Sequence, residues 1–165
     1  MTVRTSPRDP LGSCVLVAGD LHATFLPHQG MLGASLRHRG EELLRRIENL
    51  DDAAAKGSTA GIPLLHPWAN RLDGATYRAA DRDLTLDLAS PLLHLDAKRL
   101  PIHGVPWSQL TWDITSLDSR HVTARLDWSR DELLAVFPFP HALEMNATLR
   151  PDGLTIETTL VAGST

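Results

Sequence analysis

Two short segments, residues 64–72 and 100–104, carry polar side chains among Pro, Trp and Leu. The first contains Asn70 and Arg71 directly after Pro-Trp-Ala, and the second contains His103 directly before a glycine. Arginine presents a planar fork of donors, asparagine offers both a donor and an acceptor, and a neutral imidazole donates on one nitrogen and accepts on the other. Together these groups match the neighbouring hydroxyls of a small polyhydroxylated ligand such as a pyranose.

Each of these residues also has a purely structural interpretation. A buried Arg71 that binds loop carbonyls fits the spacing as well as a ligand contact does. A lone histidine such as His103 is more often satisfied within its own loop than by a substrate. Trp68 and Trp107 could offer an apolar platform to a sugar ring, although isolated tryptophans pack in cores more often than they stack on ligands.

Other catalytic patterns are missing from the sequence. The remaining histidines show no His-x-x-x-His spacing, and Cys14 has no second thiol to accompany it, so we expect no metal site. The glycines form neither a phosphate-binding loop nor a dinucleotide fingerprint, and no serine lies in a nucleophile elbow. The sequence therefore predicts a site without metal or cofactor.

The composition argues against several classes of partner. The formal net charge of −4 over 165 residues disfavours nucleic-acid binding, which requires a clustered basic surface. The apolar run at 14–18 is too short to cross a bilayer, so no membrane contact is expected. A single cysteine cannot form an internal disulfide, which favours a reducing compartment. We expect a cytoplasmic protein.

Short alternating runs near the N-terminus predict strands. Apolar residues alternate over 13–18 and 21–25 on either side of Gly-Asp, which is typical of a β-hairpin. Another extended run follows at 31–37. Residues 41–50 are ambiguous between a helix and a strand end, whereas the Ala-rich stretch 51–56 predicts a short helix that ends at a glycine.

From Tyr77 onward the pattern predicts mainly strands. Leucines alternate over 84–88, and apolar residues alternate over 122–128. Two further alternating runs, 141–149 and 154–161, flank an Arg-Pro-Asp-Gly sequence whose proline and glycine suit a turn. Many short strands with little helix predict an all-β fold, either an antiparallel sandwich or a barrel.

Four segments of the chain form an ordered series. They are Gly-Met-Leu-Gly-Ala-Ser-Leu at 30–36, Pro-Trp-Ala-Asn-Arg-Leu at 67–72, Leu-Pro-Ile-His-Gly at 100–104 and Phe-Pro-Phe-Pro at 137–140. This series resembles the first half of an aldose 1-epimerase (galactose mutarotase), and the resemblance extends over residues 30–161. Asn-Arg or His-Gly alone is a weak signal, but the ordered series followed by an Asp-Gly hairpin is much more specific.

The resemblance implies a large antiparallel β-sandwich of the galactose mutarotase type (supersandwich), whose cleft binds a free hexose without a cofactor. It implies that Asn70 and Arg71 contact sugar hydroxyls. It also implies that His103 lies beside the ring oxygen and the C1 hydroxyl, where it assists binding and proton transfer. The implied reaction interconverts the α and β anomers by acid and base catalysis of ring opening.

The sequence departs from the family after its last hairpin. The family's principal acid is a second histidine, its base is a glutamate, and an aspartate also binds sugar; all three lie downstream of that hairpin. His141 comes too early to be the second histidine, so that role is not transferred to it. We expect residues 1–10 to form a flexible lead and residues 11–165 to form the N-terminal portion of a truncated mutarotase-like sandwich.

A truncated sandwich leaves strand edges and part of its apolar inner face uncovered. We therefore expect either self-association or a second polypeptide that supplies the complementing half. Two alternative functions remain open. A hexose-6-phosphate 1-epimerase of the same fold would need extra basic groups at the cleft, and a carbohydrate-binding or assembly module would keep the sandwich without catalysis.

Overall fold

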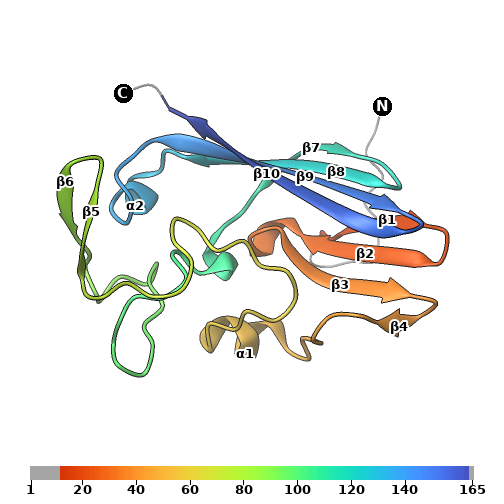
Figure 1. Cartoon of the computed structure of the whole chain (residues 1–165), viewed down its shortest axis with the longest axis horizontal. Coiled ribbons are helices and arrows are strands. Elements are labelled where there is room, and N and C mark those ends of the chain that lie inside the picture. Colours follow the sequence, from red (N-terminus) through yellow and green to blue (C-terminus); the bar gives the residue numbers. More distant parts are fainter. Residues whose placement is uncertain (1–11, 164–165) are drawn as a thin grey trace.

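The computed structural model describes residues 12–163, so the flexible lead expected at residues 1–10 lies outside the described part of the chain. The strands form two four-stranded antiparallel sheets and one two-stranded hairpin (Figure 1). The first sheet has the order β1-β2-β3-β4, the second has the order β10-β9-β8-β7, and β5 pairs with β6. The strands are β1 Cys14–Ala18, β2 Leu21–Leu26, β3 Leu32–His38, β4 Glu41–Glu42, β5 Thr76–Ala79, β6 Arg82–Thr85, β7 Asp113–Leu117, β8 His121–Trp128, β9 His141–Arg150 and β10 Gly153–Ala162.

The hairpin predicted near the N-terminus is confirmed as β1 and β2. Ala18 and Leu21 are paired across the two-residue turn, where Gly19 has a φ of +63° that suits glycine. Residues of β1 alternate between buried and exposed, with Val15 and Val17 on the outer side. The first sheet therefore has one face directed to the core and one directed to solvent.

The hairpin predicted near the C-terminus is confirmed as β9 and β10. Arg150 pairs with Gly153, so only Pro151 and Asp152 lie in the turn, which is shorter than the predicted four residues. The alternating residues of β9 are buried, whereas β10 forms the edge of the sheet and leaves Leu160 57% exposed. The edge strand contributes backbone pairing more than core packing.

The core lies between the two sheets, which stack one above the other in Figure 1. Leu16 and Phe25 from the first sheet belong to the same buried cluster as Trp128 and Leu149 from the second. Cys14 is a buried free thiol in this core. The predicted all-β antiparallel architecture is confirmed, with open sheets rather than a barrel.

The helices are short and only partly predicted. They are α1 Leu50–Ala55, α2 Asp131–Leu134 and 3-10 turns at Pro27–Gln29 and Trp107–Gln109. The Asn49 side chain caps α1 by accepting a hydrogen bond from the Asp52 N–H at 3.0 Å, and Gly57 follows its end with a φ of +59°. The helix predicted at 51–56 is thus confirmed, whereas the pattern gave no sign of α2. Within residues 12–163, no helix combines the length and apolar character that crossing a bilayer requires.

A long irregular region replaces part of the predicted β-structure. The leucine alternation at 84–88 suggested a longer strand, but β6 ends at Thr85, and regular pairing resumes only at β7. A turn at Asp87 ends the extended run, because its side-chain Oδ1 and its carbonyl oxygen accept from the Ala89 and Ser90 N–H groups, each at 2.9 Å. Prolines at 91, 101 and 106 then disfavour a central strand in the residues that follow. The yellow-to-green segments between α1 and β7 lie at one end of the sandwich in Figure 1, and both candidate site segments belong to them.

Candidate functional site

The two polar segments singled out in the sequence are held together by backbone hydrogen bonds. The Val105 N–H donates to the carbonyl oxygen of His66 at 2.9 Å, and the Leu72 N–H donates to that of Pro101 at 2.9 Å. Between these bonds, Arg71 lies opposite Ile102 in an isolated bridge. The segments 66–72 and 101–105 therefore form one unit, which brings Asn70, Arg71 and His103 together.

Asn70 and His103 are in direct contact. The His103 N–H donates to the Asn70 carbonyl oxygen at 2.7 Å, and the Asn70 N–H donates to Nδ1 of the His103 ring at 3.2 Å. Both residues have a positive φ, 59° for Asn70 and 67° for His103. Such left-handed backbone costs a non-glycine residue about 1–2 kcal/mol, and it persists only where the surroundings enforce it.

This contact fixes how the His103 ring carries its proton. Because Nδ1 accepts from a main-chain N–H, the neutral ring is protonated on Nε2. Burial, followed by the charges of His94 and Arg71, lowers the pKa of His103 below its usual 6.5. Nε2 has no hydrogen-bond partner within residues 12–163, so His103 offers a neutral N–H donor to a ligand.

Arg71 is anchored at one edge of its guanidinium. Its Nε donates to Oδ2 of Asp96 at 2.9 Å, while Oδ1 of Asp96 accepts from the Lys98 and Leu100 N–H groups at 2.8 and 3.0 Å. The Leu100 amide and then the Lys98 amide and Arg71 hold the pKa of Asp96 low. The Arg71 side chain is 50% exposed and that of Asp96 14%. An aspartate fixed by its own loop thus orients Arg71 and leaves the terminal nitrogens available.

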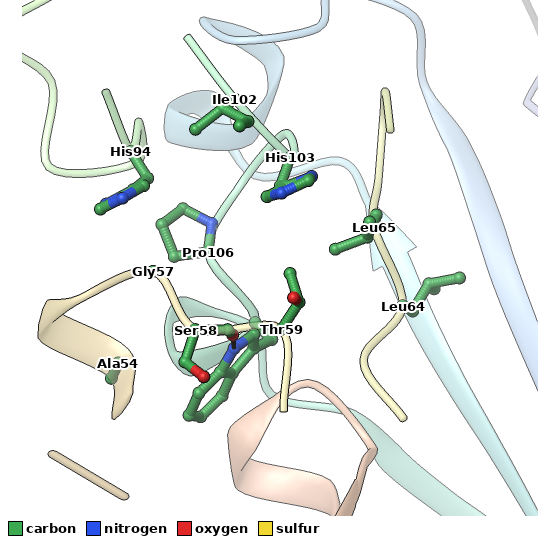
Figure 2. A pocket seen from close by; sticks show the side chains of 11 residues that line it. Ala54, Gly57, Ser58, Thr59, Leu64, Leu65, His94, Ile102, His103 and Pro106 are labelled. Atoms are coloured by element: carbon green, nitrogen blue, oxygen red, sulfur yellow. Dashed lines mark hydrogen bonds between the residues drawn. The ribbon is translucent and has the colours of Figure 1, made fainter. Parts of the chain in front are cut away.

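A narrow pocket lies beside His103 (Figure 2). Its cavity volume is about 20 Å³, which suits a single water molecule rather than a sugar. His94, Pro106 and Trp107 are among the lining side chains, and Figure 2 shows the rings of His94 and His103 along it. A Cβ at Gly57 would collide with the His94 ring, so a glycine is required where α1 ends against it.

The two tryptophans considered as a sugar platform are both packed against protein. Trp107 is 5% exposed, and its Nε1 donates to the Ser58 carbonyl oxygen at 2.9 Å. Trp68 is half-buried, with its ring centroid 5.8 Å from that of Tyr77. The structure therefore supports core packing, rather than stacking on a sugar, as the role of Trp107.

Sequence reasoning does not identify two further contacts of the site region. Asp96 has the local signature of an Asx turn, but nothing in that signature indicates its pairing with Arg71. Nε2 of His66 lies 2.8 Å from Nε2 of His141, which starts β9. The partners in these two contacts are separated by 25 and by 75 positions in the sequence, and local patterns carry no information on such pairs. Among residues 12–163, no group of three or more His, Cys, Asp or Glu side chains is arranged to hold a metal ion.

Comparisons with solved structures show the fold. The Slr1438 protein from Synechocystis sp. PCC 6803 matches with a TM-score of 0.73 and 20% identity over 98% of this chain and 52% of its own. A galactose mutarotase-like protein from Clostridium acetobutylicum matches with a TM-score of 0.74 and 21% identity, over 90% and 45% of the two chains. The GalM/aldose epimerase homologue from C. elegans matches with a TM-score of 0.73 and 17% identity, over 92% and 46%.

These matches confirm the predicted galactose mutarotase type of sandwich, and the chain spans about half the length of the structures that it matches. A search of curated proteins finds no match. A family model described as aldose 1-epimerase matches residues 22–163, which include both polar segments and all strands from β3 to β10. The chain belongs to the aldose 1-epimerase family.

Proposed function

We propose that the protein interconverts the α and β anomers of free hexoses, and that Asn70, Arg71 and His103 hold the sugar. Family membership supports the reaction class. One observation supports the site assignment above all: two oriented donors lie on adjoining segments. Arg71 is half-exposed and held by Asp96, and the contact of His103 Nδ1 with the Asn70 N–H leaves the Nε2–H of that ring as a donor. Donors fixed in this way lose little entropy when a polyhydroxylated ligand binds.

Each side chain has a role that its geometry suits. The terminal nitrogens of Arg71 can donate to two neighbouring hydroxyls, since Nε is already occupied by Asp96. The exposed Asn70 amide can donate to one hydroxyl and accept from another, because the contacts of Asn70 with His103 use only its main chain. We expect the sugar to lie over these exposed side chains, because the pocket beside His103 is too small to enclose it.

Anomer exchange requires a proton to leave the C1 hydroxyl and a proton to reach the ring oxygen. The ring then opens, rotates about the C1–C2 bond and closes on the other face of the aldehyde. In this scheme the Nε2–H of His103 donates a hydrogen bond to the ring oxygen and stabilises the charge that develops there as the ring opens. A neutral imidazole suits this role better than that of base, because its basic nitrogen faces the Asn70 amide. Removal of the C1 proton requires a separate base, and delivery of a proton to the ring oxygen requires a separate acid.

Two NMR measurements on the full chain test this function. Exchange spectroscopy measures α-to-β conversion of glucose and galactose, and chemical-shift titration measures their binding. Arg71→Ala should weaken binding about 10- to 100-fold, as expected for loss of hydrogen bonds from a charged group. Arg39→Ala is the matched control, since Arg39 forms an exposed ion pair with Asp20 at 3.1 Å.

The outcomes separate the candidate functions. Accelerated exchange that depends on Arg71 supports the proposal. Binding without exchange indicates a carbohydrate-binding module, and a marked preference for hexose 6-phosphate indicates the phosphate-specific enzyme. Unchanged affinity in Arg71→Ala would show that the sugar binds elsewhere.

A further inference from the structure

We infer that His66 and His141 act as a positioning pair, which fastens the segments carrying Asn70, Arg71 and His103 to the second sheet through one imidazole–imidazole hydrogen bond. This inference rests on the proposed function, because it takes those residues as the hexose-binding groups. The pair lies outside the pocket described above, and His66 and His141 come from a loop and from β9, respectively.

The proton positions in the pair follow from its contacts. Nδ1 of His141 lies 2.6 Å from the carbonyl oxygen of Phe139, which can only accept, so Nδ1 is the protonated nitrogen. The neutral His141 ring therefore has a bare Nε2. That nitrogen lies 2.8 Å from Nε2 of His66, which must supply the proton of the hydrogen bond. A chain of two donors thus runs from His66 through His141 to a main-chain oxygen.

The surroundings of the pair are largely aromatic. His141 is 7% exposed and stacks on Trp128 at 5.3 Å, and the His66 ring meets Trp128 edge-on at 4.9 Å. Tyr77, whose hydroxyl donates to the Val136 carbonyl oxygen, stacks on Phe137 next to the pair. The guanidinium of Arg82 lies 5.7 Å from the centre of the neighbouring Phe139 ring. Burial and then the charge of His141 lower the pKa of His66 to about 4.

A hydrogen bond packed among aromatic rings is stronger than one in water, and breaking it leaves Nε2 of the buried His141 without its partner. A single added proton can be carried on Nδ1 of His66 without breaking the bond. Two added protons would leave two N–H groups facing each other, so the bond breaks only when both rings are charged. The pKa of His66, about 4, keeps at least one ring uncharged at neutral pH, so the bond is intact there.

The position of His66 is transmitted to the hexose-binding groups by main-chain contacts. Its carbonyl oxygen accepts from the Val105 N–H, and Gly104 approaches it so closely that any side chain would collide. His103 adjoins this contact and is bonded to Asn70. A shift of His66 away from β9 would therefore displace His103 and, through it, Asn70 and Arg71.

Amide hydrogen exchange tests the pair without any sugar. In His141→Phe, which keeps an aromatic ring but loses the acceptor, the His103 and Val105 amides should exchange about five- to tenfold faster, the effect of losing one hydrogen bond. His141→Gln carries a side-chain amide close to the position of Nε2 and should restore rates to within about twofold of the wild type. His22→Phe, an exposed histidine in β2, serves as the control. Wild-type rates in His141→Phe would overturn the inference.

Sugar affinity provides the second readout. The dissociation constant for glucose should rise about five- to tenfold in His141→Phe and recover in His141→Gln. If the wild type does not bind hexose, the proposed function fails while the exchange data still decide the role of the pair. If the wild type binds and both variants bind equally well, the positioning role fails and the proposed function stands.

A direct measurement on the wild type covers the case in which His141→Phe does not fold. With ¹⁵N-labelled histidine, Nδ1 of His141 should be the protonated nitrogen, and a through-hydrogen-bond ¹⁵N–¹⁵N coupling should connect the two Nε2 atoms. A His141 ring protonated on Nε2 at neutral pH would contradict the inference.

Discussion

The main-chain N–H of His103 donates to the carbonyl oxygen of Asn70, and the Asn70 N–H donates back to Nδ1 of the His103 ring, at 2.7 and 3.2 Å. This reciprocal pair joins the two segments at the positions where both backbones are left-handed. It also sets the tautomer of the ring that we assign to the sugar. Backbone conformation, loop pairing and ligand chemistry are therefore coupled at one contact.

His103→Asn separates the two functions of the His103 ring. The asparagine Oδ1 can take the place of Nδ1 as the acceptor for the Asn70 N–H, but no group replaces the Nε2–H donor. Asparagine also tolerates a left-handed φ better than histidine does. We expect unchanged or slightly increased stability in urea unfolding and about tenfold weaker glucose binding by calorimetry. Unchanged affinity would contradict the assignment of Nε2 to the sugar.

Hexose affinity should be independent of pH above the ordinary histidine pKa of 6.5 and should fall only at more acid pH. The reason is that burial, then His94 and Arg71, lower the pKa of His103, so the neutral ring persists as the pH falls below 6.5. Protonation at Nδ1 then removes the acceptor for the Asn70 N–H. A titration series at several pH values measures this profile. His103→Asn, which cannot protonate there, should lack the acid-side decline.

Asp96→Asn should weaken hexose binding without unfolding the loop. The asparagine oxygen can still accept from the Lys98 and Leu100 N–H groups, whereas its amide nitrogen would face Nε of Arg71, a second donor. We expect the dissociation constant to rise about three- to tenfold and the stability to change by less than about 0.5 kcal/mol. Asp83→Asn, which alters an exposed ion pair with Arg78, is the control. Equal affinities for both variants would argue against orientation of Arg71 by Asp96.

His66 should make the free energy of unfolding depend on pH. Its pKa is lowered from 6.5 to about 4 in the folded chain, so the unfolded chain binds a proton that the folded chain does not between these values. Its contribution to the free energy of unfolding is constant above pH 6.5 and is lost as the pH falls toward 4, by about 3 kcal/mol in total. Urea unfolding at several pH values should show this loss in the wild type and a smaller one in His66→Phe. Parallel curves for the two proteins would be inconsistent with a buried neutral His66.

Gly104→Ala should be strongly destabilising. A Cβ at this position collides with the His66 carbonyl oxygen, and the φ of +68° is unfavourable for alanine. Gly19→Ala is the matched control, because Gly19 has a similar φ of +63° but nothing within 4 Å of the added atom. We expect about 1 kcal/mol for Gly19→Ala and at least about 3 kcal/mol for Gly104→Ala in urea unfolding. Similar losses in both variants would mean that the close approach to His66 contributes little.

The strands were predictable wherever apolar residues alternate with one face buried. The β9 run and the Gly19-Asp20 turn carry their information within a few residues, so pattern and turn chemistry suffice. Over 84–88 the same leucine pattern misled, because Asp87 forms a turn with the Ala89 and Ser90 N–H groups and ends the extended run. Local alternation reports burial, and it does not report whether a partner strand is present.

The candidate site was predictable as residue types but not as an arrangement. Asn70, Arg71 and His103 stood out as polar groups in apolar segments, and the structure brings them into one unit. Their roles toward a sugar stay predictions. Asp96 and the His66–His141 pair could not be found from local patterns, because each depends on a partner that the fold supplies from far along the chain.

Every strand of the two four-stranded sheets pairs only with strands adjacent to it in sequence, within the described residues. Such short-range pairings close small loops at little entropic cost and form early in folding. The site instead depends on contacts that span 25, 33 and 75 residues. We therefore expect the chain to unfold in two steps. In dilute denaturant the loops that hold Asn70, Arg71 and His103 should open while the sheets persist. Sugar binding should then be half lost at a lower denaturant concentration than the circular-dichroism signal of the strands.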